Sequence, residues 1–311
     1  MNDLSGWPAL VLTAGLATRL RPVSDVRAKA AMPVAGKPII GRILEWLSAA
    51  GVRRVVLNLH HRPDTIARVV GEGTEWGLEV RYSWEAKVLG SAGGPRRALP
   101  LIDADHFLIV NGDTLTDCNL TGLVERHLET QARVTMAVVP GDVGRYGGVL
   151  VGPEGRVTGF AGRASPASAL PVLHFIGVQA VNAGVFDGVA DDEPSETVRT
   201  LYPRLIAEGV ASIRAFESNA EFLDVGTAAD YHRTVATVAA REGVAFDVGE
   251  HCQIDAGAVV KDTVIWDRVV VPRATQLINC IVTDNVHVPA GERFEHCALV
   301  AGVDGLSAHA F

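Results

Sequence analysis

Two basic side chains follow the small residues that end the first apolar run of the chain. The stretch LVLTAGLATRLRPVSDVRAKAAMPVAGKP places Ala14 and Gly15 directly after this run, and Arg19 and Lys29 behind them. Small side chains let a phosphate approach backbone N–H groups, which bind anions. Arginine offers a planar fork for bidentate phosphate contact, and lysine offers a mobile point charge. The pattern therefore indicates phosphate chemistry, although each cation taken singly is also compatible with a solvated surface.

Two carboxylates stand where apolar segments end. Asp113 follows the apolar run in FLIVNGD, and Asp224 follows a second apolar segment in AEFLDVGT. Mg²⁺ is commonly held by a few protein carboxylates and takes its other ligands from water and phosphate oxygens. An aspartate in a glycine turn also forms an Asx-type hydrogen bond to its own backbone. The residues alone leave a magnesium site and simple turns as alternatives.

Short apolar runs alternate with helical patterns through about residue 240. Strand-like runs cover residues 9–15, 53–59, 79–84 and 106–113. The alternation predicts βαβ units, and hence an α/β fold with a doubly wound, mostly parallel Rossmann-like sheet. Ligands of such sheets bind beyond the carboxyl ends of the strands, which is where the residues named above are expected.

The pattern of apolar residues changes after about residue 245. Apolar residues recur near a spacing of six, at Val248, Ile254 and Val260 and, in a shifted frame, at Ile265, Val271 and Leu277. This period is typical of a parallel β-helix, in which each short strand places one aliphatic side chain in a prism-shaped core. We therefore predict a first domain over residues 1–243 and a short left-handed β-helix over residues 244–311, with an irregular β-meander as the alternative. Because such tails more often pack or oligomerise than catalyse, a homo-oligomer through the tail is one arrangement to test.

The composition disfavours several classes of protein. The 311 residues carry 28 basic and 36 acidic side chains, a formal net charge of −8, which disfavours a general nucleic-acid binder. No apolar run reaches the roughly 18 residues that span a bilayer, and the first residues lack the pattern of a signal peptide. The four cysteines form no CxxC pair, so neither a zinc site nor a disulfide framework is indicated. We expect a soluble cytoplasmic protein without nucleic-acid or membrane partners.

The opening stretch resembles the signature of sugar-1-phosphate nucleotidyltransferases, which runs approximately L-x-(A/G)-G-x-G-T-R-L-x-P, a spacer, P-K-x-x-x-P and then K-P. The chain supplies residues in this order and spacing: Leu12, Ala14, Gly15, Thr18, Arg19, Leu20, Pro22, Lys29, Pro33, Lys37 and Pro38. The resemblance continues through WEAKVLGSAGG, NGD, RYGG, FIGV and FLDVGT, from about residue 9 to residue 235. It implies that residues 1–243 form a catalytic domain that makes a nucleotide sugar and pyrophosphate from a nucleoside triphosphate and a sugar 1-phosphate.

The resemblance also implies roles in this reaction. A sugar-phosphate oxygen would attack the α-phosphorus of the nucleotide, and pyrophosphate would leave. Arg19 would grip the β- and γ-phosphates, and Lys29 would neutralise charge near the α-phosphate and the sugar phosphate. Asp113 and Asp224 would hold the Mg²⁺ cofactor, with Asp113 on the nucleotide side. No general base is required, because a phosphate monoester is already ionised near neutral pH.

Four further residues fall on the nucleotide side in this resemblance: Ala14, Gly15, Glu85 and Gly90. Backbone groups at the first two would line the nucleotide. Glu85 stands where relatives read the base, with Gly90 opposite. A carboxylate accepts hydrogen bonds from N1–H and the 2-amino group of guanine together, but only one from N3–H of uracil or thymine. Glu85 and the segment LGSAG, which is similar to the LGTAG of guanylyltransferases, therefore favour GTP.

Other segments point to other substrates. GLEVRYSWE and RRALPLI are similar to N-acetylmuramate-1-phosphate uridylyltransferases, whereas the hexapeptide tail is similar to that of mannose-1-phosphate guanylyltransferases. We expect GTP with mannose 1-phosphate or a related hexose or heptose 1-phosphate. A UTP-using N-acetylmuramate- or hexose-1-phosphate uridylyltransferase and a non-catalytic sensor of nucleotide sugars stay open as alternatives.

On the sugar side the resemblance marks Gly147 in RYGG and Gly177 in FIGV as contacts. A simple turn at the first and close strand packing at the second would explain the same glycines. The sugar-contacting E-K-P motif is missing, and GFAGRASP offers Gly162 and Arg163 in its place. Arg163 would still meet a phosphate, but no glutamate is present to bind sugar hydroxyls.

Two more departures lie in the opening stretch. Ala17 replaces the second loop glycine, which costs about 1 kcal/mol if this position needs a positive φ. Ala28 replaces the proline before Lys29, so that lysine is presented less rigidly. The remaining basic residues of the stretch, Arg21 and Arg27, receive no role.

Overall fold

A computed structural model of the chain describes residues 4–162, 170–208, 213–302 and 305–311. The chain divides into two compact units. The first comprises Met1–Gly15, Ile43–His61 and Val70–Phe222. The second comprises Leu16–Arg42, Arg62–Val69 and Leu223–Phe311. The segment behind the first strand thus folds together with the C-terminal part of the chain, and the expected domain boundary at residue 243 stays a prediction.

The first unit is built on a nine-stranded sheet whose main path is β10-β9-β11-β6-β1-β4-β5. Its parallel part consists of β1 (Ala9–Leu12), β4 (Arg54–Leu59), β5 (Glu79–Trp84) and β6 (His106–Asn111). Ala9 of β1 lies opposite Val55 of β4 on one side and opposite Leu108 of β6 on the other. β1, β4 and β6 are almost wholly buried, as expected for strands covered on both faces. The predicted α/β architecture with a parallel-rich sheet is confirmed.

The rest of this sheet is mostly antiparallel. β11 (Val172–Asn182) runs antiparallel to β6, β8 and β9, whereas β12 runs parallel to β8. The remaining strands of this sheet are β8 (Val134–Val139), β9 (Gly148–Val151), β10 (Val157–Ala161) and β12 (Ile213–Glu217), whereas β7 (Thr114–Leu115) lies outside it. The sheet is therefore mixed rather than parallel throughout.

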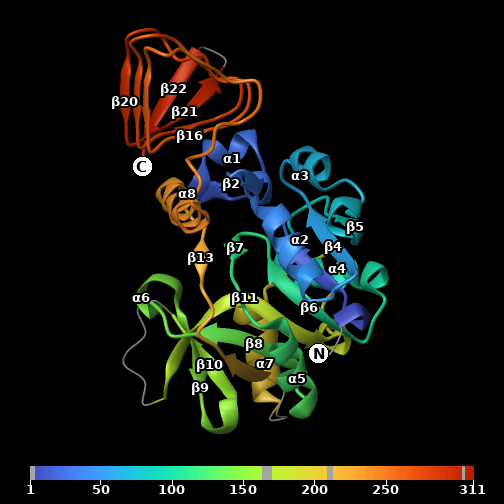
Figure 1. Ribbon diagram of the computed structural model, residues 1–311. Helices are drawn as coiled ribbons and strands as arrows, with labels where there is room; N and C mark the ends of the chain where they lie inside the picture. The colour runs from blue at the N-terminus through green and yellow to red at the C-terminus, as the bar shows by residue number, and fades with distance from the viewer. Residues whose placement is uncertain (1–3, 163–169, 209–212, 303–304) are drawn as a thin grey trace. The chain divides into compact units, whose positions relative to one another are not determined.

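Helices pack against both halves of the sheet (Figure 1). They are α4 (Gly90–Ile102), α5 (Leu120–Glu129), α6 (Val143–Tyr146) and α7 (Tyr202–Ala207), and α2 (Ile39–Ala49) spans the division of the chain. α4 contacts β1, β4 and β5, and α5 contacts β8, β11 and β12. α5 begins where the Asn119 side chain accepts a hydrogen bond from Gly122 N at 3.1 Å. Among the described residues, no helix combines the length and apolar character that crossing a membrane requires.

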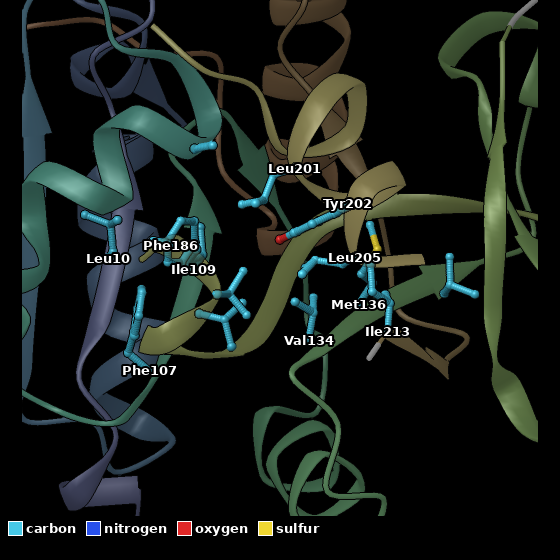
Figure 2. Close-up of a cluster of buried hydrophobic side chains, with 14 of the residues drawn as sticks. Leu10, Phe107, Ile109, Val134, Met136, Phe186, Leu201, Tyr202, Leu205 and Ile213 are labelled. Carbon is cyan, nitrogen blue, oxygen red and sulfur yellow. The ribbon is translucent and has the colours of Figure 1, made fainter. Parts of the chain in front are cut away.

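A cluster of buried side chains holds the strands of the first unit together (Figure 2). Phe107 of β6 lies 6.0 Å from Phe186, measured between ring centroids. Tyr202, at the start of α7, is fully buried, and its hydroxyl donates a hydrogen bond to Gln179 Oε1 at 2.6 Å. Each large apolar side chain buried here stabilises the fold by roughly 1.5–3 kcal/mol. This core fixes the strand ends at which the predicted site residues stand.

The second unit joins the opening stretch to the C-terminal strands. It contains α1 (Val23–Val26), α3 (Pro63–Val70), α8 (Ala228–Glu242), β2 (Pro33–Val34), β3 (Lys37–Pro38) and β13 (Leu223–Asp224). α8 begins where the Thr227 hydroxyl accepts a hydrogen bond from Asp230 N at 3.2 Å. It ends at Gly243, whose φ of 68° closes the last turn.

Short strands of the C-terminal part stack in parallel (Figure 1). Paired residues are 17 positions apart, as in Gln253 with Val270 and Gln276 with Arg293. The strands are β14 (Gln253–Ile254), β15 (Val259–Lys261), β16 (Val264–Ile265), β17 (Val270–Val271), β18 (Gln276–Ile278), β19 (Ile281–Val282), β20 (Arg293–Glu295) and β21 (Cys297–Gly302). The last strand, β22 (Gly305–Ala310), pairs antiparallel to β21. This pairing fits the predicted β-helix, and its handedness stays a prediction.

The 17-residue coil explains why the six-residue pattern slips. Three strands per coil at a strict spacing of six would need a coil one residue longer. Here one side is shorter, so the inward residue after Val260 is Ile265 and the one after Leu277 is Val282. These side chains form the core of the coil together with Val271.

Candidate active site

The turn that carries Arg19 begins at an alanine with left-handed backbone angles. Ala17 has φ 47° and ψ 42° and precedes the 3₁₀ turn Thr18–Leu20. Its carbonyl accepts hydrogen bonds from Leu20 N at 2.9 Å and Ser24 Oγ at 3.0 Å, which hold this conformation. The position therefore does need a positive φ, and alanine costs about 1 kcal/mol more than glycine there.

Arg19 and Asp224 converge on Gly226 in the second unit. A Cβ atom at Gly226 would lie 2.8 Å from Asp224 Oδ2 and 3.4 Å from Arg19 Nη2. It would also lie 3.2 Å from Oδ2 of Asp230, which is buried and forms an ion pair with Arg233. The structure thus brings together the predicted phosphate-binding arginine and one predicted metal carboxylate, and it adds Asp230, which sequence reasoning missed. A side chain at position 226 would crowd these groups, and the Asp224 carboxylate would have to shift to make room.

Lys29 begins a second 3₁₀ turn, Lys29–Ala31, and is half-buried. Ala28 before it is buried, with φ −54° and ψ 143°. A proline adopts a similar φ. However, Ala28 N donates a hydrogen bond to Thr65 Oγ1 at 3.1 Å, which a proline would lack. The hydrogen bond to Thr65 therefore restrains the backbone before Lys29 in a way that a proline would not.

Ala14, Gly15 and Asp113 share the carboxyl edge of the sheet in the first unit. β1 and β6 are parallel neighbours in register, so the residues that follow them meet at one edge. Gly112 N donates a hydrogen bond to Leu12 O at 3.0 Å, which ties the two strand ends together. Ala14 is buried, Gly15 is exposed and Asp113 is half-buried. The edge thus combines a small-residue turn from one strand end with a carboxylate from the next.

Glu85 is buried, and both its carboxylate oxygens accept hydrogen bonds from the protein. Only 1% of the residue is exposed. Oε1 accepts from Asn58 Nδ2 at 2.7 Å, and Oε2 accepts from Leu89 N at 2.8 Å. Asn58 Oδ1 in turn accepts from Thr13 N at 2.7 Å. In this structure Glu85 joins the ends of β1, β4 and β5 to the start of α4, and its role in reading a base stays a prediction.

Asn58 belongs to this hydrogen-bond network, and sequence reasoning missed it. It is 3% exposed and links Thr13 to Glu85. The signal was its polar side chain near the end of the otherwise apolar run VVLNL. A buried polar side chain needs a hydrogen-bond partner, so such an interruption at a strand end indicates a network.

Gly90 starts α4 with φ 77°. A Cβ atom there would lie 2.7 Å from both Ser195 O and Glu196 Oε1. Ser195 O also accepts a hydrogen bond from Ala92 N at 2.9 Å, and Glu196 Oε2 accepts one from Ser91 Oγ at 2.6 Å. This neighbouring segment therefore covers the first turn of α4. The expected contact of Gly90 with a base stays a prediction.

The predicted sugar-side glycines lie at close backbone approaches in the first unit. Gly177 interrupts β11 with φ 78°, and a Cβ atom there would lie 2.6 Å from Asn111 Nδ2. Gly177 is thereby placed beside the strand end that leads to Asp113. Gly147 has φ 79° and follows α6. Arg163 lies outside the described residues, and sugar contacts at all three positions stay predictions.

An aromatic cluster lies beside Gly147, whose backbone forms a hydrogen bond with His174. The Tyr146 and His174 ring centroids are 4.7 Å apart, and those of His174 and Phe222 are 4.4 Å apart. Burial lowers the pKa of His174, and a hydrogen bond with the Gly147 backbone opposes this shift. His174 Nε2 is buried without a hydrogen-bond partner in the described part of the chain. Sequence reasoning missed this cluster, because its members are far apart in the chain and belong to no motif.

Comparisons with known proteins identify the family and the fold of the chain. The family model described as nucleotidyl transferase matches residues 8–241. The chain is 28% identical over 294 residues to the mannose-1-phosphate guanylyltransferase of Mycobacterium tuberculosis, covering 91% of this chain and 81% of that protein. It is 31% identical over 227 residues to the N-acetylmuramate alpha-1-phosphate uridylyltransferase of Neisseria meningitidis, covering 70% of this chain and 93% of that protein. The fold matches the crystal structure of HddC from Yersinia pseudotuberculosis with a TM-score of 0.64 at 24% identity, over 75% of this chain and 99% of that one.

Proposed function

Because the chain belongs to the nucleotidyl transferase family, we propose that it transfers a guanylyl group from GTP to mannose 1-phosphate or a related hexose or heptose 1-phosphate. The main observation in favour of a phosphate-transfer reaction is that the Arg19 and Asp224 side chains converge on Gly226. The guanylyltransferase relative supports GTP. Its similarity covers 91% of the chain and so extends beyond the family match into the C-terminal coil, but a thymidylyltransferase relative covers the same share, so the coverage itself does not select the base.

The proposed reaction is a single displacement. An oxygen of the sugar phosphate forms a bond to the α-phosphorus, the bond from this phosphorus to the bridging β-oxygen breaks, and pyrophosphate leaves with the electron pair. Arg19 binds the departing pyrophosphate, and Lys29 neutralises charge on the α-phosphate and the sugar phosphate. The incoming phosphate is already ionised, so the chain needs to orient and neutralise rather than to remove a proton.

Asp113 and Asp224 are the proposed ligands of Mg²⁺. The donor chemistry fits, because both offer carboxylate oxygens, and Gly226 leaves open a space 2.8 Å from Asp224 Oδ2 that a Cβ atom would fill. No group of three or more His, Cys, Asp or Glu side chains gathers as a metal site in the part of the chain that the structure describes. When bound, Mg²⁺ would neutralise charge on the phosphates.

Selection of the base is assigned to the segment LGSAG, which forms the start of α4, rather than to the Glu85 carboxylate directly. Glu85 is 1% exposed and both its carboxylate oxygens already accept hydrogen bonds from the protein, so guanine would reach the carboxylate only if the surrounding segments moved apart. We therefore rest the preference for GTP on LGSAG and on the guanylyltransferase relative. Glu85 then acts indirectly, because its buried carboxylate accepts a hydrogen bond from Leu89 N and so fixes the start of this segment.

A UTP-using enzyme is the second candidate. The specific observation in its favour is the uridylyltransferase relative, which is 31% identical and matched over 93% of its length. A nucleotide-sugar sensor is a weaker third candidate, because Arg19, Lys29, Asp113 and Asp224 are all present in the sequence.

A pyrophosphate-release screen separates these candidates. Purified protein with Mg²⁺ is crossed with five nucleoside triphosphates and a panel of sugar 1-phosphates, with heat-treated protein as the control. We expect the highest kcat/KM with GTP and a manno-configured hexose or heptose 1-phosphate. Highest turnover with UTP would overturn the guanylyl proposal, and no turnover together with tight binding of a finished nucleotide sugar would favour the sensor.

A further inference from the structure

We propose that Arg27 is a positioning residue that holds the backbone before Lys29 against the C-terminal coil. The inference rests on the proposed function, because it assigns Lys29 to the reacting phosphates. It also gives the coil a role within the subunit, besides any part in oligomerisation. Arg27, Lys29 and the coil all belong to the second unit.

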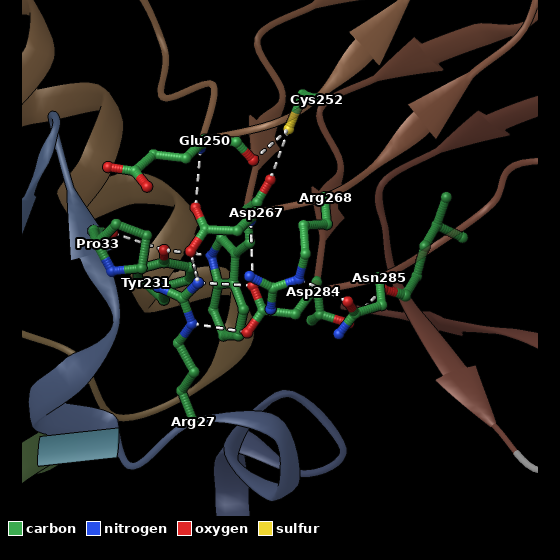
Figure 3. A network of polar contacts seen from close by, with 12 residues as sticks. Arg27, Pro33, Tyr231, Glu250, Cys252, Asp267, Arg268, Asp284 and Asn285 are labelled. Carbon is green, nitrogen blue, oxygen red and sulfur yellow. Dashed lines mark hydrogen bonds and ion pairs between the residues drawn. The ribbon is translucent and has the colours of Figure 1, made fainter. Parts of the chain in front are cut away.

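Arg27 binds two carboxylates of the coil at once (Figure 3). Its Nε donates a hydrogen bond to Asp284 Oδ2 at 2.8 Å, and its Nη2 donates to Asp284 Oδ1 at 2.6 Å. Nη2 also donates to Asp267 Oδ2 at 2.6 Å. The Arg27 and Asp284 side chains are only 16% and 11% exposed. A planar guanidinium makes this bridge, whereas a lysine point charge would not reproduce its geometry.

The repeat of the coil holds the two carboxylates ready for Arg27. Asp267 and Asp284 are 17 residues apart and therefore occupy the same position in successive coils. Asp284 Oδ1 accepts a hydrogen bond from Asp267 N at 3.0 Å, and Asp267 Oδ1 accepts one from Glu250 N at 2.9 Å. The backbone of the coil thus orients both side chains, so Arg27 binds a preformed site.

A buried aromatic pair extends this anchor to β2, which follows Lys29 in the opening stretch. The Arg27 guanidinium lies 5.0 Å from the ring centroid of Trp266, which is fully buried. Trp266 Nε1 donates a hydrogen bond to the Tyr231 hydroxyl at 3.0 Å, and this hydroxyl donates to Pro33 O at 2.6 Å. The coil and α8 therefore hold the chain on both sides of Lys29.

The backbone between Arg27 and Lys29 has little freedom to absorb a displacement. Lys29 is two residues from Arg27, which is at most about 7 Å of extended chain. Between them, Ala28 N is bound to Thr65 Oγ1 at 3.1 Å. After them, Ala31 N donates to Ala28 O at 2.8 Å, which forms the turn that carries Lys29. A shift of Arg27 is thus transmitted to the lysine.

Hydrogen exchange tests the anchor without relying on activity. We compare Arg27→Lys, Arg27→Met and Asp284→Asn with Arg21→Lys, whose native arginine makes an exposed ion pair with Asp25 at 3.2 Å. In the three anchor variants we expect faster exchange at the amides of Ala31 and Met32, with unchanged protection in β6. Protection equal to that of the Arg21→Lys control would overturn the proposal.

Kinetics then test whether the anchor acts through Lys29. We expect Arg27→Lys and Asp284→Asn to lower kcat by about 10- to 100-fold, with a smaller change in KM for the triphosphate. Arg27→Lys combined with Lys29→Ala should be no slower than Lys29→Ala alone, because the anchor has nothing left to position. If the losses in kcat of the two substitutions add up in the double variant, positioning is contradicted. The same holds if kcat falls in every variant in proportion to its loss of thermal stability.

The two experiments separate failure of the inference from failure of the proposed function. If the native protein turns over no pair of substrates, the proposed function fails, and hydrogen exchange still decides whether Arg27 orders the turn. If the native protein is active and the anchor variants match Arg21→Lys in both measurements, the inference alone fails.

Discussion

Replacing Glu85 with glutamine should destabilise the first unit while leaving the choice of nucleotide unchanged. The Glu85 carboxylate accepts from Asn58 Nδ2 and Leu89 N, so one of these donors would face the new amide NH₂ group. Asn58 cannot flip to relieve this, because its Oδ1 already accepts from Thr13 N. One buried donor without an acceptor costs about 1–3 kcal/mol. We expect a loss near 2 kcal/mol, which lowers Tm by roughly 4–8 °C.

The assay for Glu85→Gln combines thermal unfolding with nucleotide competition. Unfolding is followed by circular dichroism, and kcat/KM is measured for GTP and UTP well below the unfolding transition. The exposed Glu75→Gln is the matched control, and it should leave Tm within about 1 °C. An unchanged Tm together with a selective loss of GTP activity would refute the reasoning and show that the carboxylate reads the base.

Three further predictions follow from the site and from a buried histidine. Asp113→Ala or Asp224→Ala should abolish Mg²⁺-dependent pyrophosphate release with unchanged circular dichroism, and near-native rates in either variant would contradict the metal assignment. Gly226→Ala should lower kcat/KM by about tenfold or more, since its Cβ would lie 2.8 Å from Asp224 Oδ2; unchanged kinetics would exclude this crowding. Burial, with a smaller effect of His106, lowers the pKa of His127 to about 4. Below about pH 6.5 the imidazole therefore binds a proton in the unfolded chain, whereas in the folded chain it stays neutral until about pH 4. Stability should therefore fall by up to about 3 kcal/mol as the pH drops from about 6.5 to about 4, and His127→Gln, measured by urea unfolding, should flatten this dependence.

The elements of the fold were predictable because their signals are local. The alternation of strand and helix patterns gave the parallel part of the sheet, and the recurring aliphatic residues gave the coil. The six-residue spacing of these aliphatic residues shifts at Ile265 because one side of each 17-residue coil is shorter than the others. The antiparallel return of β11 was not predictable, because the direction of a strand leaves no trace in its apolar pattern.

Side-chain partners far apart in the chain were beyond sequence reasoning. Asn58 and Glu85 are 27 positions apart, and Arg27 and Asp284 are 257 apart. The opening stretch showed that Arg27 is basic, but its role depends on carboxylates that only the coil brings to it. Ala17 differs, because the glycine of the signature at this position raised the question of a positive φ, and the structure answers it with a left-handed backbone.

Product analysis tests the central claim most directly. Purified protein is incubated with GTP, mannose 1-phosphate and Mg²⁺, and the products are identified by mass spectrometry and ³¹P NMR. We predict GDP-mannose and pyrophosphate in equal amounts, and far less of both products from Lys29→Ala over the same time. Pyrophosphate without a nucleotide sugar, or no product from any pairing of nucleotide and sugar phosphate, would contradict nucleotidyl transfer by this site.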